Sequence, residues 1–429
     1  MFPSGLKTPN LFKLQCTNKM LHWVKSIVLQ APSNTTKKVI TRTIWILSLV
    51  SLCTDIASEM LYPVMPIFLQ KIGFSIVLIG ILEGLAEAVA GLSKIYFGQR
   101  SDQAGKRLPF VQLGYTLSAI SKPMMGIFIF PAWIFLARTM DRIGKGIRTG
   151  ARDALLSDEA TPATKGRVFG FHRSLDTLGA AIGPAVALLY LYYNPGNYRT
   201  LFFIAFVPGL LAIIASLLIK EKSKKAFVKT NNTFNFSIFT RYWKASSATY
   251  KKLVAGLLFF ALFNSTDVFL LLQMKANGLD DTAVIGVYIF YNLVYALLAY
   301  PTGMLADKFG LKKIFLCGLV LFSVVYFSFA FNQTIPIYLL LISLYGIYAA
   351  ATEGIAKAWI SNVVDKSETA SAIGTYAGFQ SIAALIASSV GGMLWYYFGF
   401  KVTFLVTAAA TMLAVFYLST INFKQTNSN

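Results

Sequence analysis

About twelve apolar runs, each long enough to cross a lipid bilayer, constrain this chain more than any other feature. A membrane-spanning helix needs roughly 20 predominantly apolar residues. Hydrophobic residues make up 56% of the 429 residues and charged residues 13%, whereas soluble domains are about half apolar and about a quarter charged. The sequence therefore predicts an all-α integral membrane protein with spans at 43–69, 75–98, 108–129, 132–153, 167–193, 200–219, 253–274, 282–302, 312–331, 336–359, 371–397 and 402–421.

Basic residues are concentrated in every second connection between these runs. Short basic loops of membrane proteins stay on the cytoplasmic side, so we expect both termini and the even-numbered connections in the cytoplasm. The same pattern predicts a basic N-terminal extension (1–42), a six-span half (43–219), a basic linker (220–252), a second six-span half (253–421) and a short tail (422–429). Residues 11–30 fit either an amphipathic helix on the anionic inner leaflet or a disordered basic tail.

The fourth span differs from the others because charges crowd into it directly after an apolar stretch. Its sequence from 137 to 159 is ARTMDRIGKGIRTGARDALLSDE. An ionised side chain that faces lipid at the centre of a span costs at least ~2.5–3.5 kcal/mol. Five basic residues fall near one helical stripe, which must therefore face the protein interior: Arg138, Arg142, Lys145, Arg148 and Arg152. Gly144, Gly146 and Gly150 leave room for a neighbouring backbone to come close.

Acidic residues that could balance this stripe lie mainly in the first half of the chain. Asp55 and Glu59 share one face of the first span, and Asp176 lies in the fifth. Glu83 and Glu87 are one turn apart in the second span, and two like charges so close favour a proton site.

The second half has fewer charges, with Asp267 near the middle of the seventh span. Its expected contribution to a central cavity is polar and aromatic: Asn264, Gln273, Tyr291, Asn292, Tyr295 and Gln380. We predict that the first half binds protons and charged groups and that the second half determines the shape of the central cavity.

Two short segments repeat at corresponding places in the two halves. GQRSDQAGKR (98–107) follows the second span and GMLADKFGLKK (303–313) follows the eighth. Both contain Gly-x-x-x-Asp-x-x-Gly followed by basic residues, and Thr-Asp pairs recur at 54–55 and 266–267. These repeated segments indicate two related six-span repeats, an arrangement found in secondary transporters.

From about residue 42 onward, the chain resembles the major facilitator superfamily. The resemblance rests on the family's cytoplasmic loop motif, which is matched by Gly98, Asp102, Gly105, Lys106 and Arg107 in the first copy and by Gly303, Asp307 and Gly310 in the second. The first copy departs from the motif at Arg100 and Gln103. The resemblance implies that these residues, together with Arg148 and Arg152, gate the cytoplasmic side.

Two further segments add to this resemblance. Gly179, Gly183 and Pro184 match a fifth-span motif associated with antiporters, although Ala187 and Leu188 replace the glycines that follow it in the family. The segment Asp-Arg-x-Gly-Lys-Gly-x-Arg at 141–148 resembles a signature of a subgroup of bacterial permeases.

The charged side chains inside the spans have two open explanations, structural ion pairing and a pathway for solute and protons. On the second explanation, the pathway comprises Asp55, Glu59, Glu83, Glu87, Arg138, Asp141, Arg142, Lys145, Asp176 and Asp267. Adjacent helix residues do not face each other. Arg142 is therefore expected to point away from Asp141 and toward the central cavity, where it would bind an anionic group of the substrate.

The resemblance implies a secondary active transporter of a bacterial inner membrane, coupled to protons and moving a small organic solute. The arginines favour an anion, such as a carboxylate metallophore (siderophore) or an organic acid, because guanidinium groups match carboxylate geometry. A multidrug or cation efflux antiporter and a non-transporting sensor remain alternatives. No nucleotide-binding loop, nucleophile elbow or metal motif is present in the sequence. We expect a monomer without enzyme activity, cofactor, metal or nucleic acid, whose partners are the lipid bilayer, a small-molecule substrate and protons.

Overall fold

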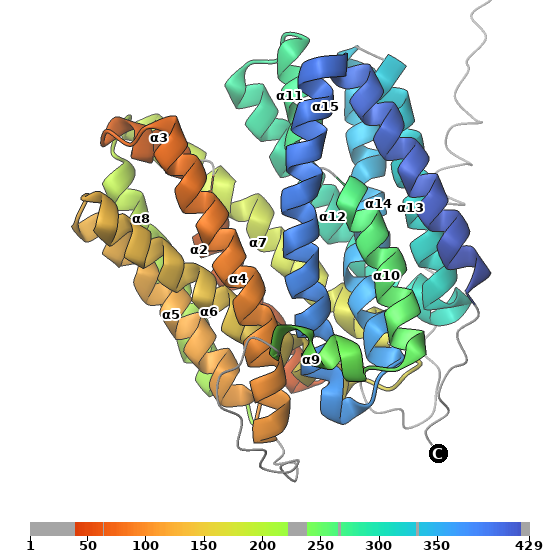
Figure 1. The fold of residues 1–429 in the computed structure, drawn as a ribbon. Helices are drawn as coiled ribbons and strands as arrows, with labels where there is room; N and C mark the ends of the chain where they lie inside the picture. The colour runs from red at the N-terminus through yellow and green to blue at the C-terminus, as the bar shows by residue number, and fades with distance from the viewer. Residues whose placement is uncertain (1–38, 63, 222–237, 265–266, 332–333, 422–429) are drawn as a thin grey trace, which may run out of the picture. The chain divides into compact units, whose positions relative to one another are not determined.

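Long helices make up both halves of the chain in the computed structural model, which describes residues 39–62, 64–221, 238–264, 267–331 and 334–421 (Figure 1). The first half contains α2 (Arg42–Glu59), α3 (Met65–Lys71), α4 (Ile76–Ala104), α5 (Leu108–Ile127), α6 (Pro131–Glu159), α7 (Lys165–Tyr193) and α8 (Tyr198–Leu217). The second contains α10 (Ala248–Phe263), α11 (Val268–Ala276), α12 (Asp281–Phe309), α13 (Leu311–Phe331), α14 (Ile335–Asn362) and α15 (Thr369–Thr420). The predicted all-α fold of two six-span halves is confirmed.

Parts of the expected extension, linker and tail lie outside the described residues, namely 1–38, 222–237 and 422–429. The described end of the linker region forms the short helix α9 (Ile238–Ala245). By length and composition, six of the described helical stretches are apolar enough to cross a membrane. Among the other predicted spans, the first and seventh are broken, and those at α5 and α6 carry the buried charges Lys122 and Arg148.

The first and seventh spans are each broken near the middle, which the continuous apolar runs did not predict. The first span divides into α2 and α3, and Pro66 lies in the first turn of α3, where a missing backbone N–H is tolerated. The seventh divides into α10 and α11, between Asn264 at the end of α10 and Asp267 at the start of α11. The first span of each half is therefore interrupted.

The last two predicted spans join almost without a break. A single helical stretch, α15, covers both, and Gly399 is its one residue with non-helical dihedral angles, φ 79° and ψ 171°. Glycine adopts this positive φ without the steric penalty that a Cβ would bring. The chain therefore turns at Gly399, close to the boundary predicted between residues 397 and 402, as the bend in α15 shows (Figure 1).

The charged helix α6 packs against α4 on one side and α5 on the other. Its glycines allow this, as the sequence predicted. A Cβ on Gly144 would lie 2.6 Å from the carbonyl oxygen of Gly114 in α5, and one on Gly146 would collide with Ser93 in α4. This close packing of the backbones shields the charged stripe of α6 from lipid, because the neighbouring helices occupy the space around it.

The two halves meet closely at the end of the helices that carries Asp102 and Asp307, called the motif end below. There α4 contacts α15 and α7 contacts α12. A Cβ on Gly98 would lie 2.5 Å from the carbonyl oxygen of Ala370, and one on Gly166 would lie 2.5 Å from the carbonyl oxygen of Gly303. Backbone therefore touches backbone between the halves, so the motif end is closed in this structure.

We expect Gly98→Ala to destabilise this closed arrangement by ~1–3 kcal/mol, the usual cost of overpacking. Gly84→Ala is the matched control on the same helix, because no atom lies within 4 Å of its added Cβ. That control should be neutral or slightly stabilising, since alanine is the better helix former. Thermal unfolding of the two purified variants measures the difference. Equal midpoints would show that the halves do not rely on this contact.

Candidate functional site

A cavity of ≈350 Å³ lies between the two halves. The first half contributes eight charged lining residues, namely Asp55, Glu59, Lys94, Lys145, Arg148, Arg152, Arg173 and Asp176. The second half contributes three, namely Asp267, Glu353 and Lys357, together with Tyr288, Tyr291, Asn292, Tyr295 and Gln380. The lining thus has the expected asymmetry, with most of the charge on one side and aromatic and amide groups on the other.

Two of the polar residues expected in the lining lie elsewhere. Asn264 lines a second, smaller cavity and donates a hydrogen bond to the Tyr348 hydroxyl, 3.2 Å away. Gln273 is buried and interacts with Tyr338. Both residues flank the break in the seventh span, which the sequence did not reveal, so their direction could not be predicted from a continuous helix.

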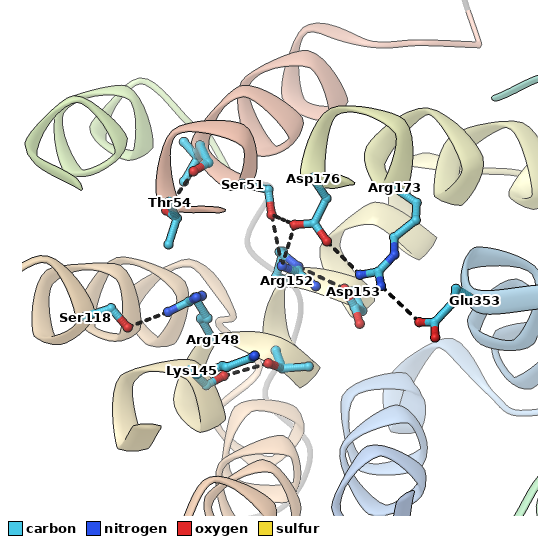
Figure 2. Close-up of polar contacts among 12 residues, drawn as sticks. Ser51, Thr54, Ser118, Lys145, Arg148, Arg152, Asp153, Arg173, Asp176 and Glu353 are labelled. Carbon is cyan, nitrogen blue, oxygen red and sulfur yellow. Dashed lines mark hydrogen bonds and ion pairs between the residues drawn. The ribbon is translucent and has the colours of Figure 1, made fainter. Parts of the chain in front are cut away.

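An ion-pair network lies on the motif-end side of the cavity and centres on Asp176 of α7 (Figure 2). Arg173 places a guanidinium nitrogen 2.7 Å from one carboxylate oxygen of Asp176. The other oxygen accepts a hydrogen bond from the Ser51 hydroxyl of α2 and lies 3.9 Å from Arg152 of α6. Three helices of the first half are therefore tied together at one buried carboxylate.

The same network crosses to the second half. Arg173 also reaches Glu353 of α14 at 3.0 Å and donates a hydrogen bond to the Tyr295 hydroxyl of α12 at 2.6 Å. Asp153 of α6 is fully buried and lies 2.9 Å from Arg152 and 2.8 Å from Lys357 of α14. Sequence reasoning named Arg152 but did not predict that Asp153 pairs with both Arg152 and Lys357. These contacts can form only while the halves are close at the motif end.

Three cations of the lining have no carboxylate within 4 Å among the described residues. Lys94 of α4 donates a hydrogen bond to the Ser381 hydroxyl, 2.8 Å away. Arg148 of α6 bonds the Ser118 hydroxyl at 2.6 Å and stacks on the Tyr115 ring. The exposed side chain of Lys145 makes no ion pair or hydrogen bond within the described part of the chain. The cavity wall formed by α4 and α6 is therefore positive.

Two carboxyl groups of α2 face this positive wall. Glu59 accepts a hydrogen bond from the Tyr288 hydroxyl, 3.3 Å away, and interacts electrostatically with Lys145. Asp55 interacts electrostatically with the carboxyl groups of Asp176 and Glu59. Two carboxylates so close repel each other, which favours a proton shared between them. Asp55 and Asp176 therefore form a place where a proton can be held.

Several residues predicted for the pathway do not line the cavity. Asp141 turns toward α5 and pairs with the buried Lys122 at 2.6 Å, with Arg138 3.8 Å away. Arg142 pairs with Glu87 of α4 at 3.1 Å and is not part of this cavity's lining. The physical reason is that α4 and α5 each supply a countercharge to the outer half of α6. The side chain of Glu83 lies outside the described residues.

Comparison with known proteins identifies the family. The family model for the Major Facilitator Superfamily matches residues 47–291 and 253–428. The chain belongs to the major facilitator superfamily. An uncharacterized MFS-type transporter of Methanocaldococcus jannaschii is 30% identical over 371 residues, which cover 85% of this chain and 91% of that protein. The multidrug resistance protein MdtH of Proteus mirabilis is 22% identical over 77% of this chain and 80% of its own length.

Solved structures agree with this assignment at the level of the fold. The human organic anion transporter MFSD10 (TETRAN) superposes with a TM-score of 0.75 at 14% identity, over 89% of this chain and all of that one. The major facilitator FucP in the outward conformation gives a TM-score of 0.74 at 11% identity, over 90% of this chain and all of that one. The chain is thus an integral membrane protein of a transporter family.

In this superfamily member, the repeated aspartates each cap a helix of the opposite half. Asp102 accepts hydrogen bonds from the backbone N–H and the hydroxyl of Ser371, at 2.7 and 2.8 Å, in the first turn of α15. Asp307 accepts from the backbone N–H groups of Gly166 and Arg167, at 2.7 and 3.0 Å, in the first turn of α7. A carboxylate is favoured there because the first backbone N–H groups of a helix lack partners.

Arg107 links the first aspartate to the rest of the motif end, despite the departures from the motif at Arg100 and Gln103. Its guanidinium lies 3.0 Å from Asp102, bonds Asp158 of α6 and donates to the carbonyl oxygen of Lys366. Lys106 beside it is exposed. Gly105 and Gly310 follow α4 and α12 with positive φ values of 64° and 101°, so glycine permits both tight turns.

The glycines of the antiporter-like motif have a packing role within the first half. A Cβ on Gly179 would lie 2.6 Å from the carbonyl oxygen of Leu52, and one on Gly183 would lie 2.7 Å from the backbone nitrogen of Met60. Pro184 follows inside α7. These residues let α7 lie directly against α2, which carries Asp55 and Glu59.

We expect Asp153→Asn to lower the free energy of unfolding by ~3–5 kcal/mol, because it leaves Arg152 and Lys357 without their buried countercharge. Glu353→Gln is the matched control in the same network. The Glu353 side chain is 39% exposed, so its loss should cost only ~0–1 kcal/mol. Chemical unfolding in detergent measures both. Similar losses of unfolding free energy in the two variants would contradict the larger contribution assigned to Asp153.

The motif end should respond to pH through Asp102, which lies beyond the predicted span 75–98. Burial raises the pKa of this carboxyl from 3.8 to about 6, against the opposing effect of Arg107. Because the folded state binds the proton more tightly than the unfolded state, this group adds stability as the pH falls through about 6 and loses it as the pH rises. The thermal midpoint of the wild type, followed from about pH 7 to about pH 5, should therefore include a rise that comes from the protonation of Asp102. Asp102→Asn should lack it, and parallel curves would assign the pH response to other groups.

Proposed function

We propose that this protein is a proton-coupled secondary transporter of a small organic anion that works by alternating access. The observation that carries the proposal is the positive wall of the cavity, where Lys94, Lys145 and Arg148 have no ion pair within the described residues. Cations that face a cavity without a directly paired carboxylate attract an anion, and a guanidinium or ammonium binds carboxylate strongly where water is limited.

The size of the cavity supports a small solute. Ligand sites typically occupy ~300–1,000 Å³, and ≈350 Å³ is at the lower end of that range. This volume favours an organic acid over a bulky metallophore. The name of one structural neighbour, an organic anion transporter, fits the same class of solute.

The orientation follows from charge. We propose that the motif end faces the cytoplasm of a bacterial inner membrane, with both termini on that side, because the basic loops lie there. The structure, closed at the motif end, would then be an outward-facing state. Opening to the cytoplasm would require the ion pairs of Arg173 with Glu353 and of Lys357 with Asp153 to separate.

Proton coupling follows from the position of Lys145 opposite Asp55 and Glu59, with which it interacts electrostatically. While these carboxyl groups are ionised, they compensate Lys145 from across the cavity. When they take up a proton, the positive charge of Lys145 becomes available to the anion. Proton and anion thus favour each other's binding, which is the thermodynamic requirement for symport.

A cation efflux antiporter is the second candidate, and one observation favours it. Asp55, Glu59 and Asp267 place carboxyl groups in the lining, and the MdtH relative is named as a multidrug resistance protein. We rank it second because two of these carboxyl groups already have neutral or carboxyl partners, Tyr288 and Asp176, whereas the lysines have no ionic partner.

Transport in proteoliposomes tests the proposal with radiolabelled benzoate, succinate and citrate as probes. Asp55→Asn should abolish uptake driven by a pH gradient and keep exchange of internal for external anion, because the proton site is lost and the positive wall remains. Lys145→Gln should reduce both by about tenfold or more, the effect of ~1.4 kcal/mol. Lys401→Gln, at an exposed position outside the cavity and the repeated motifs, is the charge-matched control. Transport of tetraphenylphosphonium by the wild type, with no anion flux, would contradict the proposal and support the efflux alternative.

A further inference from the structure

One face of α12 presents tyrosines to the cavity from the second half. Tyr288, Tyr291 and Tyr295 are spaced three and four residues apart, so they share a face of the helix. Their ring centroids are 6.3 Å apart from Tyr288 to Tyr291 and 6.1 Å apart from Tyr291 to Tyr295. All three line the cavity whose other wall is positive. The site therefore joins a charged side to an aromatic side.

We infer that the anion bound in this cavity carries a planar aromatic ring, which packs against Tyr291 while its carboxylate faces Lys145 and Lys94. The inference rests on the proposed anion transport and narrows its substrate class. The inference depends on the tyrosine wall, whereas the proposed anion transport depends on the cations. An experiment can therefore contradict one without contradicting the other.

Tyr291 is the tyrosine left available for a ligand. The hydroxyl of Tyr288 is engaged with Glu59, and that of Tyr295 accepts a hydrogen bond from Arg173. The ring of Tyr295 also lies 5.5 Å from the Arg173 guanidinium and is buried. Tyr291 is partly exposed, and its hydroxyl has no hydrogen-bond partner within the described residues.

The aromatic wall is rigid, which favours recognition of ring shape. Behind Tyr291 lies Tyr345 of α14, with ring centroids 5.2 Å apart, and Tyr345 lies 5.2 Å from Tyr348. Tyr348 in turn packs 4.6 Å from Phe322 of α13. Because this aromatic cluster is buried and close-packed, Tyr291 is held in place before any ligand arrives, and little ordering has to occur on binding.

The second-half wall offers few amide groups to a sugar or polyol. A hydroxylated ring brings several polar groups that lose water on binding and need partners in return. The second half supplies Asn292 and Gln380 for that purpose, but the Asn292 amide nitrogen already donates to the Tyr288 carbonyl oxygen at 3.0 Å. Tyrosine faces and edges instead suit another aromatic ring, which packs offset or edge-on against them.

Four small probes separate the effect of the aromatic ring from the effect of the negative charge, because each differs from benzoate in one property. Benzoate is an aromatic anion, cyclohexanecarboxylate a non-aromatic anion of similar size, benzamide a neutral aromatic and benzamidinium a planar aromatic cation. Binding to the purified full-length protein is measured by calorimetry. We expect benzoate to bind tightest, cyclohexanecarboxylate to bind roughly threefold or more weakly, and the two other probes to bind more weakly still.

Variants then assign the preference to residues. Tyr291→Leu should lower benzoate affinity to that of cyclohexanecarboxylate, and Tyr291→Phe should keep the preference because the ring remains. Lys145→Gln should weaken both carboxylates by a similar factor and leave their ratio unchanged.

The outcomes distinguish the inference from the function on which it rests. Equal binding of the two carboxylates to the wild type, or an unchanged ratio in Tyr291→Leu, would overturn the aromatic inference and leave anion transport standing. Tighter binding of benzamidinium than of benzoate, or no binding of either carboxylate, would overturn both.

Discussion

The cost of placing charge in an apolar bundle governs the structure, and α6 is where that cost is concentrated. An unpaired charge in the interior is unfavourable by several kcal/mol, so each basic residue of α6 needs a partner or a polar cavity. Arg142 finds Glu87 on α4, and Arg152 finds Asp153 beside it. Lys145, without an ion pair, faces the cavity. The positions of α4 and α5 around α6 follow from these requirements as much as from apolar packing.

The same cost explains why the two halves are joined by charges at the motif end. Asp153 is fully buried and needs Lys357 of the other half as well as Arg152. Asp102 and Asp307 each complete the hydrogen bonding of a helix start in the opposite half. These contacts are cooperative, because any separation of the halves breaks them together. On the proposed alternating-access mechanism, this design favours switching between two states, since a partly opened motif end would leave several buried charges without partners.

The sequence predicted the features that depend on local pattern and missed those that depend on helix rotation. The apolar runs gave the spans, and the glycines of α6 gave its close packing. The repeated motif located Asp102 and Asp307 at one end. Pairing could not be predicted for Asp141, because its partner Lys122 lies on a different helix and only the rotation of α5 decides the contact. The breaks in the first and seventh spans were missed for a related reason, since hydrophobicity alone does not distinguish a bent span from a straight one.

The charge balance of the cavity sets the stoichiometry that the proposed coupling requires. Six basic residues line it: Lys94, Lys145, Arg148, Arg152, Arg173 and Lys357. Five acidic residues line it, namely Asp55, Glu59, Asp176, Asp267 and Glu353, and the buried Asp153 pairs with two of the bases. With every group ionised, six charges of each sign cancel.

A monoanion bound alone leaves one negative charge in excess, and a proton shared by Asp55 and Asp176 alone leaves one positive charge. Both together restore neutrality, so a low-dielectric cavity accommodates them best as a pair. We therefore expect one proton to accompany each negative charge of the solute, and a dianion to require a second carboxyl group, for which Glu59 is the candidate because it interacts electrostatically with Lys145.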